Sequence, residues 1–145
     1  MNRDGSGRSK VSPFPIGQIN DISSDRRWVS GLAAGPPGGT IAIPTTGGKP
    51  RVICRSCGNL AEWDSRGKFF YFNVDSLQKV WAIPTIAGEA LPKLPPSGIG
   101  GLDLSSVFPG SRVIENFLIS PGPDPSVYAY VKTTMRRNLF RIPLP

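Results

Sequence analysis

Ile41-Ala42-Ile43-Pro44-Thr45, followed by Gly47-Gly48, returns about forty residues later as Trp81-Ala82-Ile83-Pro84-Thr85, followed by Ala87-Gly88. A repeat of this period is typical of architectures in which each copy is one supersecondary unit that buries its apolar face only against its neighbours. The sequence therefore predicts consecutive copies of one small unit.

The composition favours short strands joined by tight turns. The 145 residues include 17 glycines and 16 prolines, and 39% are hydrophobic, which is enough for a folded core. Aromatic and β-branched residues stand in short runs between the glycines and prolines. No stretch keeps a helical period, and proline recurs too often for a long helix. The predicted fold class is all-β.

Two copies of the unit have the pattern of four-stranded antiparallel meanders. The strands expected in the first copy span residues 17–22, 28–32, 40–44 and 50–54. The strands expected in the second copy span residues 60–63, 69–72, 79–84 and 89–94.

A third copy is stretched and cut short. After a Gly-, Ser- and Pro-rich connection over residues 95–110, two strands are expected at 112–119 and 127–131, around a turn at 120–126. The stretch Asn138-Leu139-Phe140-Arg141-Ile142-Pro143 then repeats the Ile-Pro strand of the first two copies. We expect this last unit to lack a fourth strand.

These units resemble the TolB-like, WD-type propeller repeat. Its units contain a Ser-Pro-Asp-Gly-Lys turn, an apolar or aromatic strand, an Ile-Trp-x-Val-Pro strand, and Gly-Gly before an outer strand. The first copy offers Ser23-Ser24-Asp25-Arg26-Arg27 and Ile41–Pro50, and the second offers Asp64-Ser65-Arg66-Gly67-Lys68 and Val80–Pro84. The resemblance extends from about residue 16 to the end. The chain departs from the family's pattern at three places. Arg26 stands where the pattern has Gly, Arg66 stands where it has Asp, and the third turn is longer.

The resemblance implies a radial architecture in which each meander is one blade and the first strand of each blade lines a central channel. Propellers typically need four to eight blades to close. The expected architecture is therefore a partial β-propeller with an incomplete ring, the C-terminal portion of a larger propeller. The alternative is that the meanders close on one another as a compact barrel or sandwich.

The expected organisation has four parts. They are a disordered polar lead-in over residues 1–15, blade 1 over 16–54, blade 2 over 55–95, and a linker with an incomplete blade 3 over 96–145. Residues 1–11 are basic and polar without an apolar centre, so they predict neither a signal peptide nor a membrane anchor. The sequence contains no run of about eighteen consecutive apolar residues, so it predicts no membrane span. The resemblance implies a periplasmic or extracytoplasmic location only for a longer parent protein.

The absence of histidine limits the chemistry that the sequence can support. Ser/His/Asp and Cys/His triads and imidazole ligands for zinc are ruled out. The formal net charge is +7, but the basic residues are spread along the sequence. A local cluster is found only near the end, at Lys132, Arg136, Arg137 and Arg141. A solvated turn explains this cluster better than a nucleic-acid site does.

Cys54-Arg55-Ser56-Cys57 has the spacing of half a zinc site or of a redox dithiol. Structural zinc needs four ligands, and the sequence holds no further cysteine to complete the set. A thioredoxin-type motif would open a helix, whereas this motif lies between two expected blades. We therefore expect ordinary loop cysteines able to form a local disulfide, and no metal site or cofactor.

Four carboxylates lie on or beside corresponding strands and turns, at Asp21, Asp25, Glu62 and Asp64. In a closed propeller some of them could face one rim together and bind a cation. Short Asp side chains that accept hydrogen bonds from their own turns explain Asp25 and Asp64 more simply.

Aromatic side chains recur on equivalent strands, at Trp28, Phe69, Phe70, Tyr128 and Tyr130. They could form a stacking platform for bases. Packing between blades is the favoured interpretation. Nucleic acid is therefore not an expected partner.

The resemblance implies a non-catalytic binding or scaffold segment. TolB-like domains recognise protein or peptide at the propeller rim, including in the sensor region of some bacterial serine/threonine kinases. The alternative is the gating portion of a prolyl-oligopeptidase-like serine peptidase that lacks its catalytic domain. Such a peptidase needs a Gly-x-Ser-x-Gly elbow and a late histidine, and the sequence contains neither.

In either case we expect no enzyme and no catalytic residues in this chain. The expected partner is a protein or a peptide. The remaining blades of a larger propeller, or self-association, would cover the exposed edge strands.

Overall fold

Three antiparallel sheets follow one another along the chain. The computed structural model describes residues 4, 6–7, 10–36, 38–96, 98–99, 108–132 and 134. The first sheet has the order β1-β2-β3-β4 and consists of β1 (Ile16–Ile22), β2 (Trp28–Ala33), β3 (Thr40–Pro44) and β4 (Arg51–Cys54). The second sheet has the order β5-β6-β7-β8 and consists of β5 (Ala61–Trp63), β6 (Phe69–Val74), β7 (Lys79–Pro84) and β8 (Arg112–Ile114).

The third sheet is a hairpin of β9 (Ile119–Asp124) and β10 (Val127–Tyr130), called here the C-terminal hairpin. One 3-10 turn, η1 (Asp75–Leu77), is the sole helical element in the part of the chain that the structure describes. The prediction of an all-β fold made of antiparallel meanders is confirmed. The described strands close into neither a barrel nor a propeller ring.

The repeated Ile-Pro strand is the third strand in both large sheets. Trp28 pairs with Pro44 in the first sheet, and Phe69 pairs with Pro84 in the second. Because proline has no N–H to give to a ladder, it stands at the end of each strand, as expected. The sequence repeat is therefore a repeat of register as well as of composition.

The fourth strand of the second sheet differs from the prediction. Residues 89–94 do not form it, and β8 takes this place instead. The segment expected as one strand over 112–119 is divided between β8 and β9, so the second sheet continues past the expected limit of residue 95. Much of the predicted turn over 120–126 belongs to β9.

Prolines and a second edge explain the failed strand over 89–94. Pro92 lies within this stretch, and Pro95 and Pro96 follow it directly, so none of these three residues can donate an N–H to a ladder. The chain goes instead to the free edge of β4, where the N–H of Ile99 donates to the carbonyl oxygen of Ile53 at 2.6 Å. The stretch 138–143, expected as a further strand, lies outside the described residues.

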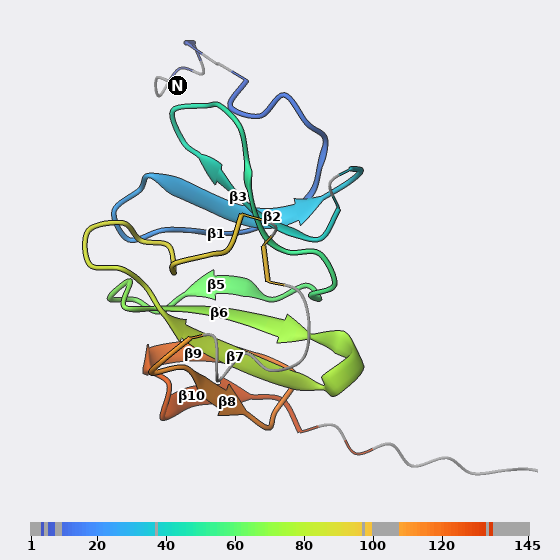
Figure 1. Cartoon of the computed structure of the whole chain (residues 1–145), viewed down its shortest axis with the longest axis vertical. Coiled ribbons are helices and arrows are strands. Elements are labelled where there is room, and N and C mark those ends of the chain that lie inside the picture. The colour runs from blue at the N-terminus through green and yellow to red at the C-terminus, as the bar shows by residue number, and fades with distance from the viewer. Residues whose placement is uncertain are drawn as a thin grey trace, which may run out of the picture.

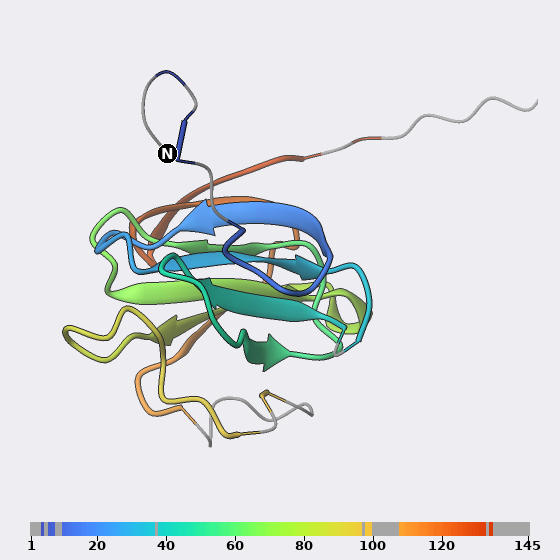
Figure 2. The same cartoon turned by 90° about the horizontal axis from the view of Figure 1, so that it is seen from above.

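The three sheets are stacked in chain order (Figure 1). Figure 2 looks down on the first sheet with the second sheet behind it. Their shared core joins Ala42 and Ile53 of the first sheet to Phe70 and Phe72 of the second. The two sheets approach each other most closely where β5 meets β1 and β2. Loop residues complete the core, namely Leu91, Ile99 and Phe108.

The second sheet has a further apolar face. Successive side chains of a strand point to opposite faces, so Tyr71 lies on the other side from Phe70 and Phe72. Tyr71 packs with Val80, Ala82 and Ile114, and this face also contacts Ile119 and Tyr128 of the hairpin region. The second sheet is therefore covered on both faces.

The aromatic residues expected to pack between units do so in four cases. Trp28 and Phe70 belong to the core between the two large sheets. Phe69 and Tyr128 belong to the core beneath the hairpin. Tyr130 differs, because it is 56% exposed on the outer hairpin strand, with its ring 6.2 Å from that of Tyr128. The packing prediction is wrong for Tyr130.

Part of the expected disordered lead-in has defined contacts. Ser12 is buried, and its hydroxyl donates to the carbonyl oxygen of Phe14 at 3.0 Å. The N–H of Ala34 donates to the carbonyl oxygen of Pro15, which continues the edge of the first sheet by one residue. In the described part of the chain, no helix has the length and apolarity needed to cross a membrane.

Candidate functional site

Equivalent turns of the two large sheets meet at one edge of the stack. Residues 23–27 join β1 to β2, residues 64–68 join β5 to β6, and residues 85–90 follow β7. Together they enclose a groove of about 510 Å³, called here the rim groove. Its lining consists of Ser24, Asp25, Arg66, Gly67, Lys68, Phe69, Thr85, Ile86, Ala87, Gly88 and Ala90.

The two turns have the same hydrogen bonds at corresponding positions. The N–H of Trp28 donates to Ser23 Oγ at 2.9 Å, and the N–H of Phe69 donates to Asp64 Oδ1 at 2.7 Å. Each turn also has a residue of positive φ at its fourth position, Arg26 at 59° and Gly67 at 66°. The sequence alignment of the two turns is therefore confirmed residue by residue.

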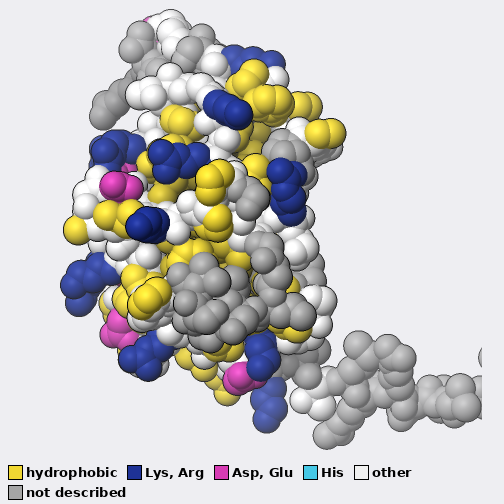
Figure 3. All heavy atoms as spheres, viewed as in Figure 1, with side chains coloured by type: hydrophobic (Ala, Val, Ile, Leu, Met, Phe, Trp, Pro, Cys, Tyr) yellow, Lys and Arg dark blue, Asp and Glu magenta, His cyan; other side chains and the backbone are white. Residues whose placement is uncertain are grey.

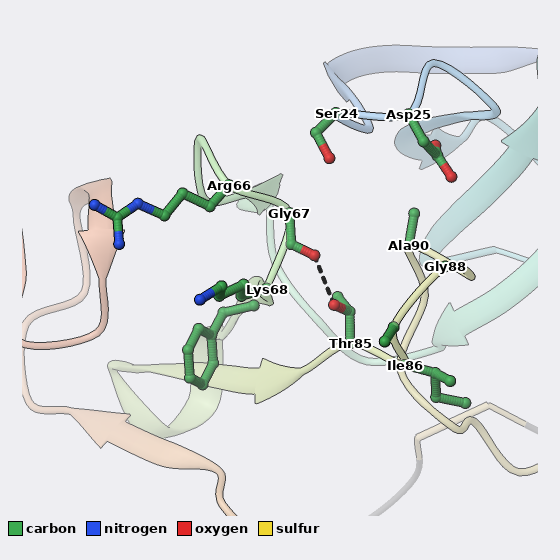
Figure 4. A pocket seen from close by; sticks show the side chains of 11 residues that line it. Ser24, Asp25, Arg66, Gly67, Lys68, Thr85, Ile86, Gly88 and Ala90 are labelled. Carbon is green, nitrogen blue, oxygen red and sulfur yellow. Dashed lines mark hydrogen bonds between the residues drawn. The ribbon is translucent and has the colours of Figure 1, made fainter.

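The threonine of each repeat closes its turn. Thr45 Oγ1 donates to the carbonyl oxygen of Arg26 at 2.9 Å, and Thr85 Oγ1 donates to that of Gly67 at 2.6 Å (Figure 4). Their backbone N–H groups donate to the carbonyl oxygens of Arg27 and Lys68. The sequence did not lead us to expect that these threonines hold the turns. The feature that could have shown it is the threonine that follows each Ile-Pro.

The turn carboxylates serve the backbone, as expected. Asp64 is buried and accepts hydrogen bonds from the N–H groups of Phe69 and Arg66. Asp25 Oδ1 accepts from the N–H of Arg27 at 3.0 Å and from Ser23 Oγ at 2.7 Å, and Oδ2 accepts from Arg27 Nε at 2.6 Å. Desolvation opposes ionisation of Asp25, but the hydrogen bonds from Ser23 and Arg27 outweigh it and hold its pKa below the ordinary value.

Asp21 and Glu62 lie close together on β1 and β5, the first strands of the two large sheets. Asp21 Oδ2 accepts a hydrogen bond from the N–H of Trp63 at 2.9 Å, which ties β1 to β5. Burial, and then the negative charge of Asp21, raise the pKa of Glu62. Within the described residues no group of three or more potential ligands is placed to hold a metal ion. The four carboxylates are therefore not brought together as one cation site.

The exposed charges of the rim groove are mainly positive. Figure 4 shows Ser24 and Asp25 on one side of it, Lys68 on the other, and Arg66 extending away from them. Arg66 reaches toward the C-terminal hairpin, where hydrogen bonds from Ser126, and then the charge of Arg66, lower the pKa of Asp124. Arg27 also donates to the carbonyl oxygen of Gly88 across the groove. Such a groove suits partners that carry carboxylates.

Basic side chains occur elsewhere as well. Lys and Arg are spread over the face of the molecule in Figure 3, among hydrophobic side chains. This distribution fits the sequence interpretation that the positive charge is dispersed. Arg136, Arg137 and Arg141 of the predicted basic cluster lie outside the described residues.

Cys54 and Cys57 form a disulfide, the local bond that the sequence analysis allowed. Their Cα atoms are 5.5 Å apart, and the bond closes the loop that follows β4. Both sulfurs are thereby occupied, so this pair contributes no thiolate ligands in the oxidised protein. The bond fixes Arg55 and Ser56 beside the end of the first sheet.

The sequence matches no protein-family model, no curated protein and no solved structure.

Proposed function

We propose that this chain is a non-catalytic protein-binding module, a section of a larger propeller of the TolB-like, WD type, whose rim groove recognises a peptide segment of a partner protein. The observation that carries the proposal is the groove itself, because equivalent turns of two consecutive units build it. Propeller rims present such repeated turns side by side. The close approach of β5 to β1 and β2 also supports a radial arrangement of units.

The electrostatics of the groove select the kind of peptide. Asp25 is paired with Arg27, and Asp64 is buried within its own turn. Arg66 and Lys68 are exposed, and neither forms a salt bridge within the described part of the chain. Lys68 lines the groove, and Arg66 extends from the same turn toward the C-terminal hairpin, where its charge acts on Asp124. These two cations favour a peptide with carboxylate side chains.

Selection from a random peptide display library tests this function. Wild-type protein should enrich sequences rich in Asp and Glu, and the double variant Arg66→Glu, Lys68→Glu should not. The matched control is Lys132→Glu, which changes an exposed lysine outside the groove and should select as wild type does. Equal enrichment by wild type and the double variant would contradict the proposal.

Exposed apolar side chains support a role within a larger assembly. Ile19 and Ile22 of β1 are largely exposed, at 64% and 55%. Leu118 and Val131, which flank the C-terminal hairpin, are also exposed, at 58% and 67%. Large exposed apolar side chains favour association. Sedimentation velocity should show an average mass that rises with protein concentration, and an invariant monomer would contradict this part of the proposal.

A further inference from the structure

A second cleft lies at the other end of the strands from the rim groove. The turn between β5 and β6 lines the rim groove, whereas this cleft is lined by the residues just before β5 and by the residue just before β7. It has a volume of about 470 Å³ and is called here the amide cleft. Sites for small molecules have volumes of roughly 300 to 1,000 Å³, so the amide cleft is large enough to hold one.

Uncharged amide side chains dominate the lining of the amide cleft. They come from β1, β6 and the segments that precede β5 and β7, and they are Gln18, Asn20, Asn59, Asn73 and Gln78. Each amide presents N–H donors and an oxygen acceptor side by side. No lysine or arginine is among the described lining residues. The cleft therefore favours an uncharged ligand whose groups both donate and accept hydrogen bonds, over a phosphate or a carboxylate.

Two acceptors in the amide cleft have no donor. Asn20 Oδ1 is a buried atom without a hydrogen-bond partner, although the Nδ2 group of the same side chain donates to the carbonyl oxygen of Asn59. The Glu62 carboxylate is partly buried, and within the described residues it accepts no hydrogen bond and forms no salt bridge. Because a desolvated acceptor without a donor costs free energy, both oxygens are places for O–H groups of a ligand.

One wall of the amide cleft is apolar. It consists of Phe117 and Leu118, just before β9, and Ile119, the first residue of that strand. Phe117 is partly buried, and the N–H of Val131 donates to the carbonyl oxygen of Leu118 at 3.3 Å, which holds this segment to the end of the C-terminal hairpin. The ring of Phe117 offers a flat apolar surface. The cleft thus joins hydrogen-bonding groups of the two large sheets to an apolar wall from the hairpin region.

We propose that the amide cleft binds a neutral saccharide. Hydroxyl groups of the sugar donate to Asn20 Oδ1 and to Glu62, and its oxygens accept hydrogen bonds from the neighbouring amides. The apolar C–H face of the sugar ring packs on Phe117. A nucleotide or an acidic sugar fits less well, because the described lining holds a carboxylate and no cation. The amide cleft shares no residue with the rim groove, so this inference goes beyond peptide recognition and can be tested separately from it.

An array of immobilised neutral and acidic glycans, probed with the labelled full chain at pH 7, tests the proposal. Wild type should bind a subset of the neutral glycans. The best of them, as the free oligosaccharide, is then titrated into the variants by calorimetry. The double variant Gln18→Ala, Asn59→Ala should bind it about tenfold more weakly or worse, and so should Phe117→Ala. Gln18 and Asn59 are exposed, so the double variant should keep the urea midpoint of wild type.

Glu62→Gln separates loss of the site from loss of the fold. A carboxylate accepts stronger hydrogen bonds than an amide, so this variant should bind the glycan about fivefold more weakly or worse at pH 7. The same change removes a desolvated charge and is expected to stabilise the protein, so weaker binding cannot result from unfolding. The matched control is Glu89→Gln, an exposed carboxylate outside the cleft, which should bind within about twofold of wild type.

Four outcomes would overturn the proposal. The first is that wild type binds no neutral glycan, or prefers acidic ones. The second is equal affinity of wild type and the double variant Gln18→Ala, Asn59→Ala. The third is a loss of glycan binding in Arg66→Glu, Lys68→Glu alone, which would place the sugar in the rim groove. The fourth is tighter binding of an uncharged nucleoside such as adenosine with the same dependence on Glu62, which would assign the cleft to nucleosides.

Discussion

Arg26 and Gly67 occupy the same position in successive turns, and both have a left-handed backbone conformation. Glycine adopts this conformation without steric cost, whereas a residue with a Cβ is disfavoured by about 1 kcal/mol. We expect Arg26→Gly to increase the free energy of unfolding by about that amount. Urea denaturation followed by tryptophan fluorescence measures the change.

The matched substitution in the second turn should act in the opposite direction. A Cβ added at Gly67 would clash with Ser24 Oγ, in addition to the positive φ at this position. We therefore expect Gly67→Ala to lower the free energy of unfolding by about 1 to 2 kcal/mol. If Arg26→Gly destabilised the protein, or if Gly67→Ala left it unchanged, the equivalence of the two turns would be wrong.

Glu62 gives the stability a dependence on pH. Its pKa is raised in the folded protein by burial and by Asp21, so the unfolded chain loses this proton at a lower pH than the folded protein does. The free energy of unfolding therefore falls as the pH rises from the ordinary pKa to the raised one. Glu62→Gln removes this loss, so we expect a higher urea midpoint than wild type at pH 7.

The same comparison at pH 3 provides the control for Glu62. Both states of the wild type hold the proton at that pH, so the gain from Glu62→Gln should be absent. A gain of equal size at both pH values would show that the charge of Glu62 is not its cause.

The roles of single residues were predictable where the local sequence decides them. The Asp side chains of the turns behave as expected, because their partners are N–H groups only a few residues away. Packing between blades was expected for Tyr130 by analogy with equivalent strands, but Tyr130 is 56% exposed, although its ring lies beside that of Tyr128, which packs against the second sheet. The rim groove could not be predicted, since it joins segments that are distant in sequence.

At the scale of elements, a hydrogen bond from Thr85 joins the end of β7 to the turn between β5 and β6. Its hydroxyl donates to the carbonyl oxygen of Gly67 in a partly buried setting. Thr85→Val keeps the shape and removes the donor, so we expect a loss of about 1 kcal/mol in the free energy of unfolding. Thr46→Val alters an exposed neighbour of the equivalent threonine and should change stability by less than about 0.5 kcal/mol. If both variants changed the free energy of unfolding by similar amounts, the stabilising role of the Thr85 hydrogen bond would be contradicted.

Seven of the first eight predicted strands were found, and the reason for the miss is long-range pairing. Residues 89–94 were expected to pair with β7 because they follow it at the spacing seen in the first unit. The strand that pairs with β7 is β8, which follows a long connection. Local pattern cannot show which distant segment reaches an open strand edge, so both β8 and the boundary at residue 95 were missed.

At the scale of the whole molecule, the repeat predicted the order of units but not their mutual packing. The stack depends on alternation along β6, which sends Phe70 and Phe72 to the first sheet and Tyr71 to the hairpin side. The four consecutive aromatic residues Phe69 to Phe72 indicate that both faces of the second sheet are covered at β6. Which sheet covers which face required the structure.

The central claim is that consecutive sheets stack face to face, because the rim groove exists only if the turns of both sheets meet. Nuclear Overhauser spectroscopy of the full chain with labelled methyl groups tests it most directly. We predict cross-peaks from the methyl groups of Ala42 and Ile53 to the rings of Phe70 and Phe72, which share one core. Cross-peaks confined to residues of the same sheet, with none between the two sets, would contradict the stacked arrangement and the rim groove with it.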